Sequence, residues 1–508
     1  MKYTINEIDY LNLCNDFSEI LSIKKLPKEV LAIPWMHIIR EHPEVLKRYE
    51  FLFSNNFVFY CFKKKIKNIL FNNYYKLKWL YNNSFIYSFN DFTSKASKLS
   101  TDFLFITHVL NYESINSKKD FYFEDIFYDL SKKGYNIFIA KIPHFSLNKK
   151  RLKDNNWDNN YIFFTQLPLE YENLITKRID AAKIFLNDLI SKQRSSSKRK
   201  ILKYAKILLS EEGVRKELRL DIQIEILIEK TKPKFMVIPF EGHSFERLAF
   251  NVCRAKGQVN SIAYQHTGTF RLSNAIKQSI NGYNPDYIFV GGNEAKIFFE
   301  KESHFNSEKI HVLGSGRGSI SLNKSYIENN HEKRQKCLVL PEGIVDECEK
   351  LFTISIECAV LLPNIKFIWR LHPLLNFNDI LGGKLAKNKL PPNIEISSQD
   401  LFDDINESSW VLYRGTTTIF KAISAGLRPI YFKADEQMTL DPLHFLTKWR
   451  LIATNSKEIA TCIHNDYNNN FDEFNFFYNL SNEICKSRFD RINLSLFDKI
   501  YNSKNQNL

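Results

Sequence analysis

Short apolar runs rich in β-branched and aromatic residues recur along most of the chain, and segments of helix length separate them. The first series of runs occupies 102–107, 136–140, 161–165, 235–239, 261–264, 286–290 and 309–313. Helix-length segments such as 172–192 and 214–230 lie between them. Continuous apolar strands that alternate with helices are typical of parallel sheets covered on both faces. The alternation therefore predicts an α/β fold with doubly wound parallel sheets.

The alternation stops at the glycine-rich segment 314–318 and resumes after a polar stretch. The second series of runs occupies 337–340, 366–371, 393–397, 410–413 and 429–432. We therefore predict two tandem Rossmann-like domains, over 101–325 and 335–467, with a hinge at 314–318. Residues 1–100 have helical spacing without strands and predict a helical N-terminal extension. Residues 468–508 are expected to form a C-terminal helix, near 474–487, and a tail.

The composition excludes several classes of protein. Hydrophobic residues make up 44% and charged residues 25% of the 508 residues, which rules out a disordered or fibrous chain. The eight cysteines form no CxxC pair, so neither a zinc ribbon nor a disulfide framework is expected. The sequence has no signal-peptide pattern at its start and no apolar window long enough to span a bilayer. We expect a cytoplasmic protein.

Basic residues exceed acidic ones by 71 to 57, and the excess is uneven. One basic cluster is interleaved with aromatic residues and comprises Lys63, Lys64, Lys65, Lys67, Lys76 and Lys78. Such a cluster is either an ordinary solvated face or a surface for an anionic partner. We therefore expect possible peripheral contact with the inner face of the cytoplasmic membrane.

Two loops that follow strands of the first domain carry groups suited to acid–base chemistry. The run at 235–239 leads into Glu241 and Gly242, and a carboxylate in such a turn acts as a general base when burial raises its pKa. The same acid could instead stabilise the N-terminus of the next helix. The run at 261–264 leads into His266, a second candidate base. Gly242 is a candidate binding residue because it permits close backbone approach.

A histidine followed by a proline ends one strand of the second domain. The run at 366–371 leads into His372 and Pro373, and the proline favours extended geometry at His372. Arg370 alternates onto the same side of the strand. A charged imidazole beside an arginine neutralises a departing phosphate or donates a proton to it. The other His-Pro pair begins at His42 in the helical extension and is interpreted as a coincidence.

Two further loops of the second domain predict an anion site. The run at 410–413 is followed by Arg414, Gly415, Thr416, Thr417 and Thr418, and then by a predicted helix. Hydroxyls and backbone N–H groups at a helix N-terminus bind phosphate, whereas capping alone would need one hydroxyl.

Glu342 and Gly343 follow the first strand of the second domain and complete the predicted binding residues. The sequence has no Walker A lysine motif, no HExxH motif and no aspartate set after a strand. We therefore predict no metal ligands and no cofactor.

The acid-Gly, Arg-Leu-His-Pro and Gly-Thr-Thr-Thr segments, together with the SAGLRPI segment at 424–430, resemble those of two-Rossmann (GT-B) glycosyltransferases of bacterial surface-carbohydrate synthesis. They are most similar to the bacterial sialyltransferases and Kdo transferases that use CMP-sugars. The resemblance implies metal-independent transfer of a nonulosonic acid or Kdo-type sugar from a CMP donor. It implies a glycan or glycolipid acceptor, in capsule, surface-polysaccharide or lipopolysaccharide biosynthesis.

In that family an acid-acid-Gly motif supplies the general base, and a His-Pro motif and a Ser/Thr pair hold the CMP phosphate. The resemblance therefore implies that Glu241 is the base and that His372 is a phosphate-binding general acid. It implies that Thr416 and Thr417 are phosphate ligands. Phe240 stands where the family often has a second acid, and threonines replace the commoner serines.

Two alternatives remain open at this point. The segment 265–269 also resembles the His-Gly-Thr segment of CDP-glycerol glycerophosphotransferases, which implies His266 as the base instead of Glu241. A basic nucleic-acid-binding protein is an alternative of another class, and it predicts a contiguous basic face. No sequence motif of a known nucleic-acid-binding module supports that class, so we expect a nucleotide-sugar donor and no nucleic acid.

Overall fold

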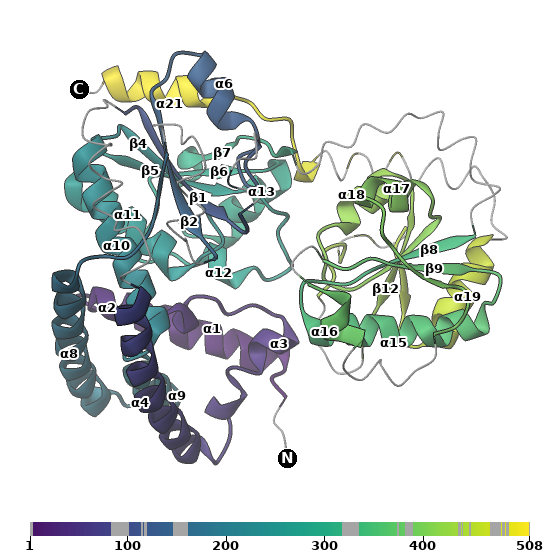
Figure 1. The fold of residues 1–508 in the computed structure, drawn as a ribbon, viewed down its shortest axis with the longest axis horizontal. Helices are drawn as coiled ribbons and strands as arrows, with labels where there is room; N and C mark the ends of the chain where they lie inside the picture. The colour runs from purple at the N-terminus through teal and green to yellow at the C-terminus, as the bar shows by residue number, and fades with distance from the viewer. Residues whose placement is uncertain are drawn as a thin grey trace.

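The computed structural model describes residues 4–82, 101–112, 115, 119–145, 161–316, 335–372, 375–381, 390–434, 438, 440–444, 446, 449–467, 479, 483 and 487–506. It contains two parallel β-sheets that lie side by side, one in each half of the molecule (Figure 1). Helices cover both faces of each sheet. The predicted fold class, two doubly wound Rossmann-like units, is confirmed.

The first sheet has seven strands in the order β3-β2-β1-β4-β5-β6-β7, and all neighbouring pairs are parallel. The strands are β1 Phe103–Val109, β2 Ile137–Pro143, β3 Tyr161–Phe163, β4 Phe235–Pro239, β5 Asn260–Gln265, β6 Tyr287–Val290 and β7 Ile310–Val312. Alternate residues of β1 enter different cores: Leu104 packs on one face of the sheet and Phe105 on the other. Burial on both faces explains the continuous apolar runs.

The second sheet has six strands in the order β10-β9-β8-β11-β12-β13, again all parallel. The strands are β8 Lys336–Leu340, β9 Lys366–Trp369, β10 Ile394–Ile396, β11 Trp410–Tyr413, β12 Arg428–Phe432 and β13 Leu451–Ala453. Its helices are α15 Val345–Leu361, α16 Phe377–Leu381, α17 Leu401–Asn406, α18 Ile419–Ser424 and α19 Ser456–Tyr467. The sequence analysis did not predict the short edge strand β13.

The N-terminal extension is helical, as predicted, and packs into the core of the first domain. Its helical segments are α1 Glu7–Leu21, α2 Lys28–Leu31, η1 Pro34–Met36, α3 Pro43–Leu46, η2 Glu50–Leu52 and α4 Phe57–Asn82. Asn6 caps α1 by accepting a hydrogen bond from the backbone N–H of Asp9 at 2.9 Å. Phe17 and Leu31 share one hydrophobic cluster with Ile106 of β1. The extension and the first sheet therefore form one folding unit.

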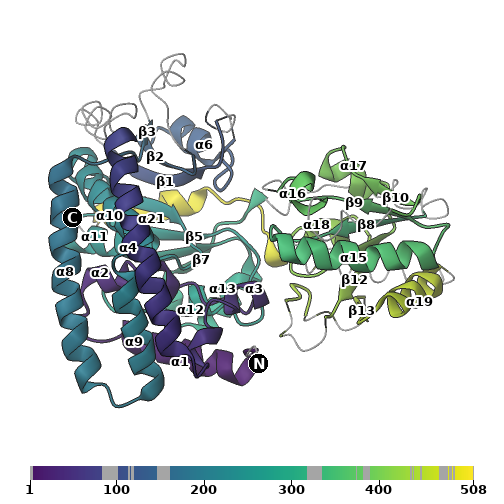
Figure 2. The same ribbon diagram turned by 60° about the horizontal axis from the view of Figure 1, so that its bottom comes forward.

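Further helices complete the first domain and its link to the second. They are α6 Ile126–Lys132, α8 Leu169–Lys192, α9 Ser196–Leu208, α10 Glu212–Thr231, α11 Ser244–Lys256, α12 Asn274–Lys277, α13 Asn293–Glu302, η4 Ser307–Lys309 and α21 Ser495–Gln506. Helices α4, α8 and α9 lie side by side at one end of the molecule (Figure 2). None of the helices in the described ranges combines the length and apolar character needed to cross a bilayer.

The C-terminal segment returns from the second domain to the first. Helix α21 packs on the first sheet through Phe497 and Ile500 (Figure 1). The returning chain pairs with the chain leaving the first domain, because Ser315 N–H donates to the Asp490 carbonyl at 2.9 Å. The part of the predicted hinge that is described, 314–316, therefore lies at this double crossing. Most of the helix predicted near 474–487 falls outside the described residues.

Candidate functional site

The strand order locates the expected ligand sites. In each sheet the order reverses once, between β1 and β4 in the first and between β8 and β11 in the second. Ligands of open parallel sheets bind beyond the carboxyl ends of the strands at such reversals. The loops after β4, β8 and β11 carry the acid-Gly, Glu-Gly and threonine motifs found in the sequence.

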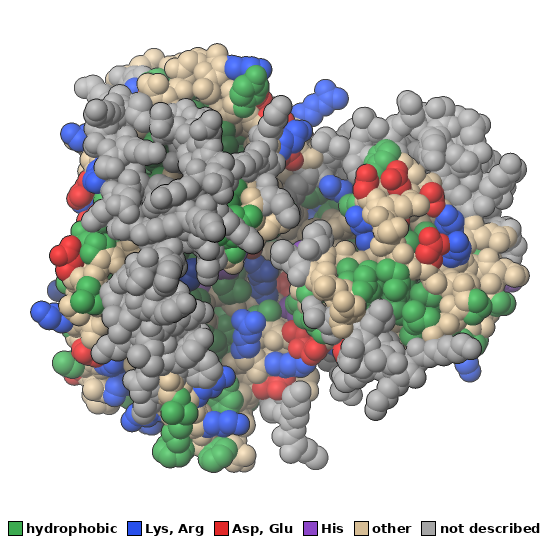
Figure 3. Space-filling view, viewed as in Figure 1, with side chains coloured by type: hydrophobic (Ala, Val, Ile, Leu, Met, Phe, Trp, Pro, Cys, Tyr) green, Lys and Arg blue, Asp and Glu red, His purple; other side chains and the backbone are tan. Residues whose placement is uncertain are grey.

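A pocket of about 730 Å³ lies between the two domains, a volume within the usual range for small-molecule sites. The loops after β4 and β5 line one side, and the loops after β8, β9 and β11 line the other. The N-terminal extension closes part of the rim with Arg40, Glu41 and His42. Figure 3 shows the surface hollowed between the domains, with charged side chains of both signs along the hollow.

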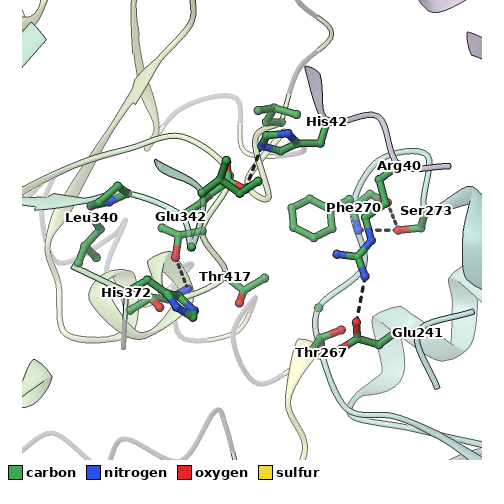
Figure 4. A pocket seen from close by; sticks show the side chains of 18 of the residues that line it. Arg40, His42, Glu241, Thr267, Phe270, Ser273, Leu340, Glu342, His372 and Thr417 are labelled. Atoms are coloured by element: carbon green, nitrogen blue, oxygen red, sulfur yellow. Dashed lines mark hydrogen bonds and ion pairs between the residues drawn. The ribbon is translucent and has the colours of Figure 1, made fainter. Parts of the chain in front are cut away.

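Glu241 lies on the first-domain wall, as predicted, but its environment differs from that of a poised base. The Nη2 of Arg40 donates to Glu241 Oε2 at 2.9 Å (Figure 4), and His243 Nε2 lies 3.6 Å from the same oxygen. Burial alone would raise the pKa of Glu241. The His243 hydrogen bond and the charges of Arg40 and His243 outweigh it and hold that pKa well below its ordinary value.

Gly242 and Glu246 fix the turn that carries Glu241. Gly242 has a φ of +87°, and a Cβ built on it would lie 2.3 Å from the carbonyl oxygen of Ala275, so only glycine fits. The Glu246 carboxylate accepts hydrogen bonds from the backbone N–H groups of Gly242 and His243, both at 2.8 Å. Burial raises the pKa of Glu246 to about 7. The close approach predicted at Gly242 is therefore toward the backbone of its own domain.

His372, Glu342 and Gly343 lie together on the second-domain wall (Figure 4). Burial lowers the pKa of His372, and the charge of Glu342 opposes that shift without cancelling it. A Cβ on Gly343 would lie 3.1 Å from Nδ1 of His372, so glycine leaves the imidazole its place. Pro373 falls outside the described residues. The imidazole is therefore neutral in the unliganded protein near neutral pH and ready to gain a proton beside an anion.

The threonine loop also lines this wall. Thr416, Thr417 and Thr418 all line the pocket. The Thr416 hydroxyl oxygen accepts from the backbone N–H of Thr418 at 3.3 Å, and the Thr418 side chain makes no capping bond to α18. A Cβ on Gly415 would lie 2.2 Å from Glu342 Oε1, so glycine lets that carboxylate lie over the loop. The hydroxyls are therefore placed to meet a ligand.

Arg414 does not line the pocket, which corrects its predicted binding role. Its side chain is 2% exposed, and its Nε donates to Glu347 Oε2 at 2.5 Å. Its Nη1 donates to the carbonyl of Phe432 at 3.2 Å. A bidentate group enclosed in this way stabilises the domain core and does not reach a ligand.

Arg414→Met is therefore expected to destabilise the fold by about 3–5 kcal/mol, because it leaves the buried Glu347 carboxylate with one cationic partner fewer. Nucleotide affinity per folded molecule should not change. Chemical denaturation and ligand titration of the same preparation measure the two quantities separately. Loss of affinity without loss of stability would return Arg414 to the binding site.

Two other predicted residues are placed differently from expectation. Arg370 lines the pocket, but its Nη1 donates to Asp404 Oδ2 at 2.6 Å and to the Gln399 carbonyl at 2.8 Å. Its charge is thus already balanced. His266 is buried, with its ring edge-on to Tyr122 at a centroid separation of 4.7 Å. His266 is not among the residues that line the pocket.

The sequence analysis missed the contribution of the extension. Arg40 reaches Glu241, and His42 Nε2 lies 3.3 Å from Glu342 Oε2 of the other domain (Figure 4). Lys47 adds a second link across the gap, to Asp346 at 3.1 Å. The His-Pro pair at His42 was the one available signal, and its interpretation as a coincidence is wrong in this respect.

One group of side chains near the pocket could hold a metal ion. His42, Glu342 and Glu347 offer ligand atoms within 4.8 Å of one another. Glu347 is already paired with Arg414 and, at 2.7 Å, with Lys350. Its charge is therefore balanced without a metal ion. The predicted metal independence stays a prediction.

No model of a known protein family matches the chain, and no curated protein sequence matches it. Similar solved structures include S. aureus MnaA with UDP, at 13% identity and a TM-score of 0.45, covering 77% of this chain and 93% of that one. UDP-GlcNAc 2-epimerase from Neisseria meningitidis bound to UDP-GlcNAc has 11% identity, coverage of 80% and 100%, and a TM-score of 0.44. Acinetobacter baumannii MurG has 8% identity, coverage of 80% and 99%, and a TM-score of 0.42. Similarity at this level does not assign an activity.

Proposed function

We propose that this chain is a GT-B glycosyltransferase that moves a sugar from a nucleotide donor to a hydroxyl of an acceptor. The observation that carries the proposal is the chemistry of the interdomain pocket. One wall presents a carboxylate, Glu241, and the other presents an imidazole and hydroxyls after strands of the second sheet. A base on one side and groups for an anionic leaving group on the other are what glycosyl transfer requires.

In the proposed reaction the acceptor oxygen attacks the anomeric carbon, and the bond from that carbon to the phosphate oxygen breaks. The acceptor proton passes to Glu241, and the negative charge that develops on the nucleotide phosphate is met by His372, Thr416 and Thr417. Because Arg40 holds the pKa of Glu241 low, the acceptor must loosen that ion pair before the carboxylate becomes an effective base. Movement of the two domains would supply such a change.

The motif resemblance supports a finer proposal for the substrates. It supports a CMP-linked nonulosonic acid or Kdo-type sugar as the donor and a surface-polysaccharide or lipopolysaccharide acceptor, without a metal ion. The alternative, a CDP-glycerol type of phosphotransferase, needs His266 as the base. Burial of His266 away from the pocket lining favours Glu241 and therefore the glycosyltransferase.

Thermal-shift titration with CMP, CDP, UDP, GDP and ADP tests the proposal, because a bound ligand stabilises the fold by mass action. We expect one nucleotide to raise the melting temperature and His372→Ala to remove the effect. His304→Ala, at an exposed histidine of the first domain, is the matched control. No response to any nucleotide would contradict the proposal, and a response to CDP or UDP alone would redirect the donor.

The nucleic-acid-binding alternative fits the pocket less well. Its lining includes four carboxylates, those of Glu41, Glu124, Glu241 and Glu342. Phosphate backbones bind grooves in which cations predominate. Salt-sensitive binding of RNA or DNA by the purified protein would nevertheless overturn the enzyme proposal if no nucleotide bound.

We propose that helix α4 rests on an anionic membrane surface. Exposed apolar side chains along α4 are Val58, Phe59, Phe62, Ile66 and Leu70. At 100° per residue these positions fall within an arc of about 120°. Lys65 flanks one edge of the arc, and Lys63 and Lys67 flank the other. An apolar stripe bordered by lysines is typical of helices that lie in the headgroup region of a membrane.

Replacing Lys63, Lys65 and Lys67 together with glutamine should weaken binding to anionic vesicles by about a hundredfold, at about 1 kcal/mol per lysine near the surface. The same replacement of Lys177, Lys301 and Lys457, which are exposed elsewhere, is the control. Co-sedimentation with phosphatidylglycerol vesicles measures the partition coefficient. Equal binding by the two triple variants would contradict the proposed role of α4.

A further inference from the structure

A second cavity, of about 230 Å³, adjoins the first-domain side of the site. Glu241 lines both this cavity and the interdomain pocket. His108 at the end of β1 and His144 just after β2 line it, and so does the start of α11. The cavity therefore lies at the reversal point of the first sheet, where an acceptor would approach the carboxylate from its own domain.

The two histidines from β1 and β2 form a hydrogen-bonded imidazole pair. Nδ1 of His108 lies 2.9 Å from Nε2 of His144. One proton must lie between these nitrogens, so the pair is either neutral or carries one positive charge. When it is neutral, only one of the two outer nitrogens is a donor. When it gains one proton, both outer nitrogens donate.

Burial and nearby cations keep the pair neutral in the unliganded protein. Burial, the charge of His144 and that of His243 lower the pKa of His108 to about 3, and Lys216 contributes in the same direction. Burial also lowers the pKa of His144, with Lys216 and His243 adding to the effect. Glu241 is the nearby acid that opposes these shifts. An anion in the cavity would reverse the balance and make protonation favourable.

The acids around the cavity are already engaged. Glu217 of α10 accepts a hydrogen bond from the Ser244 hydroxyl at 2.8 Å, and burial raises its pKa. Glu246 is held by backbone N–H groups of its own turn, and Glu241 by Arg40. Lys216, by contrast, is exposed at the cavity and has no ion pair with any residue that the structure describes. Donors are thus in excess over acceptors.

We propose that this cavity binds an anionic group of the acceptor, a carboxylate or a phosphate, between Lys216 and the His108–His144 pair, with uptake of one proton by the pair. This inference rests on the proposed function, since it assigns the cavity to the acceptor beside Glu241. His243 and Tyr122 border the same space and limit its size. A neutral sugar would leave the cationic groups unmatched and would bind more weakly.

Isothermal titration with sulfate tests the site, because sulfate stays fully ionised between about pH 6 and about pH 8, where histidine titrates. Glucuronate and glycerol 3-phosphate form the carboxylate and phosphate arms, and glucose is the neutral control. The variants are Lys216→Met and His144→Gln, with the exposed Lys177→Met of α8 as the matched control. Titration in buffers of different ionisation enthalpy counts the protons taken up.

We expect sulfate to bind about tenfold more tightly at the lower pH, with proton uptake. Each variant should weaken binding by about tenfold or more, the loss of one charge-assisted hydrogen bond. Binding that survives in both variants, or that His372→Ala removes instead, would overturn the inference. Nucleotide stabilisation should persist in Lys216→Met and His144→Gln, so its presence or absence judges the proposed function separately from the anion site.

Discussion

His372→Ala should lower the rate of sugar transfer by about 10²- to 10⁴-fold, the usual contribution of a positioned acid. It should also weaken nucleotide binding, because the imidazole lies on the second-domain wall beside Gly343 and Glu342. The pKa of His372 is lowered by burial, so the side chain must gain a proton as the phosphate binds. Nucleotide affinity of the wild type should therefore rise as the pH falls, and this dependence should be lost in the variant.

Calorimetric titration between about pH 6 and about pH 8 measures the dependence, and product formation from the nucleotide-sugar measures the rate. His304→Ala, at an exposed histidine of the first domain, controls for removal of an imidazole. A pH-independent affinity in the wild type, or normal turnover in His372→Ala, would mean that the imidazole does not contact the leaving phosphate.

Glu241→Gln should also cost about 10²- to 10⁴-fold in transfer rate, while nucleotide affinity stays nearly unchanged. The amide keeps the shape of the side chain and can still meet Arg40, but it cannot accept the acceptor proton. Comparison of kcat with the nucleotide dissociation constant separates the two effects. A variant that loses nucleotide binding and turnover together would place Glu241 in the donor site instead.

Arg40→Met provides an independent check on the same carboxylate. The ion pair with Arg40 helps to hold the pKa of Glu241 low, so removing the guanidinium should raise that pKa. Because the base must be ionised, the acidic limb of the kcat/KM profile should move to higher pH. Arg48→Met, at an exposed arginine of the same extension, should leave the limb where it is. An unmoved limb in Arg40→Met would exclude Glu241 as the titrating base.

The strands were predictable because burial on both faces makes each one continuously apolar. Every run singled out in the sequence corresponds to a strand, from β1 to β12. Strand β13 escaped because it has three residues, of which Ile452 is 48% exposed. An edge strand of that length has no continuous pattern to detect. The parallel order followed from the strand–helix alternation.

The positions of the site loops were predictable, but the partners of their side chains were not. Sheet topology brings Glu241, His372 and the threonine loop to one pocket whatever the side chains do. Arg414 and Arg40 exchange the expected roles: Arg414 is enclosed by Glu347, and Arg40 reaches the pocket from a distant segment. Such long-range ion pairs depend on the tertiary fold and leave no periodic signal in the sequence.

The central claim is that the second-domain wall of the interdomain pocket holds a nucleotide. Hydrogen exchange measured by mass spectrometry, with and without the nucleotide that stabilises the protein, tests it most directly. We predict slower exchange in the loops after β8, β9 and β11, over 340–344, 370–372 and 413–418, and no change along α4. Unchanged exchange in these loops, or protection confined to the basic helix α4, would contradict the account.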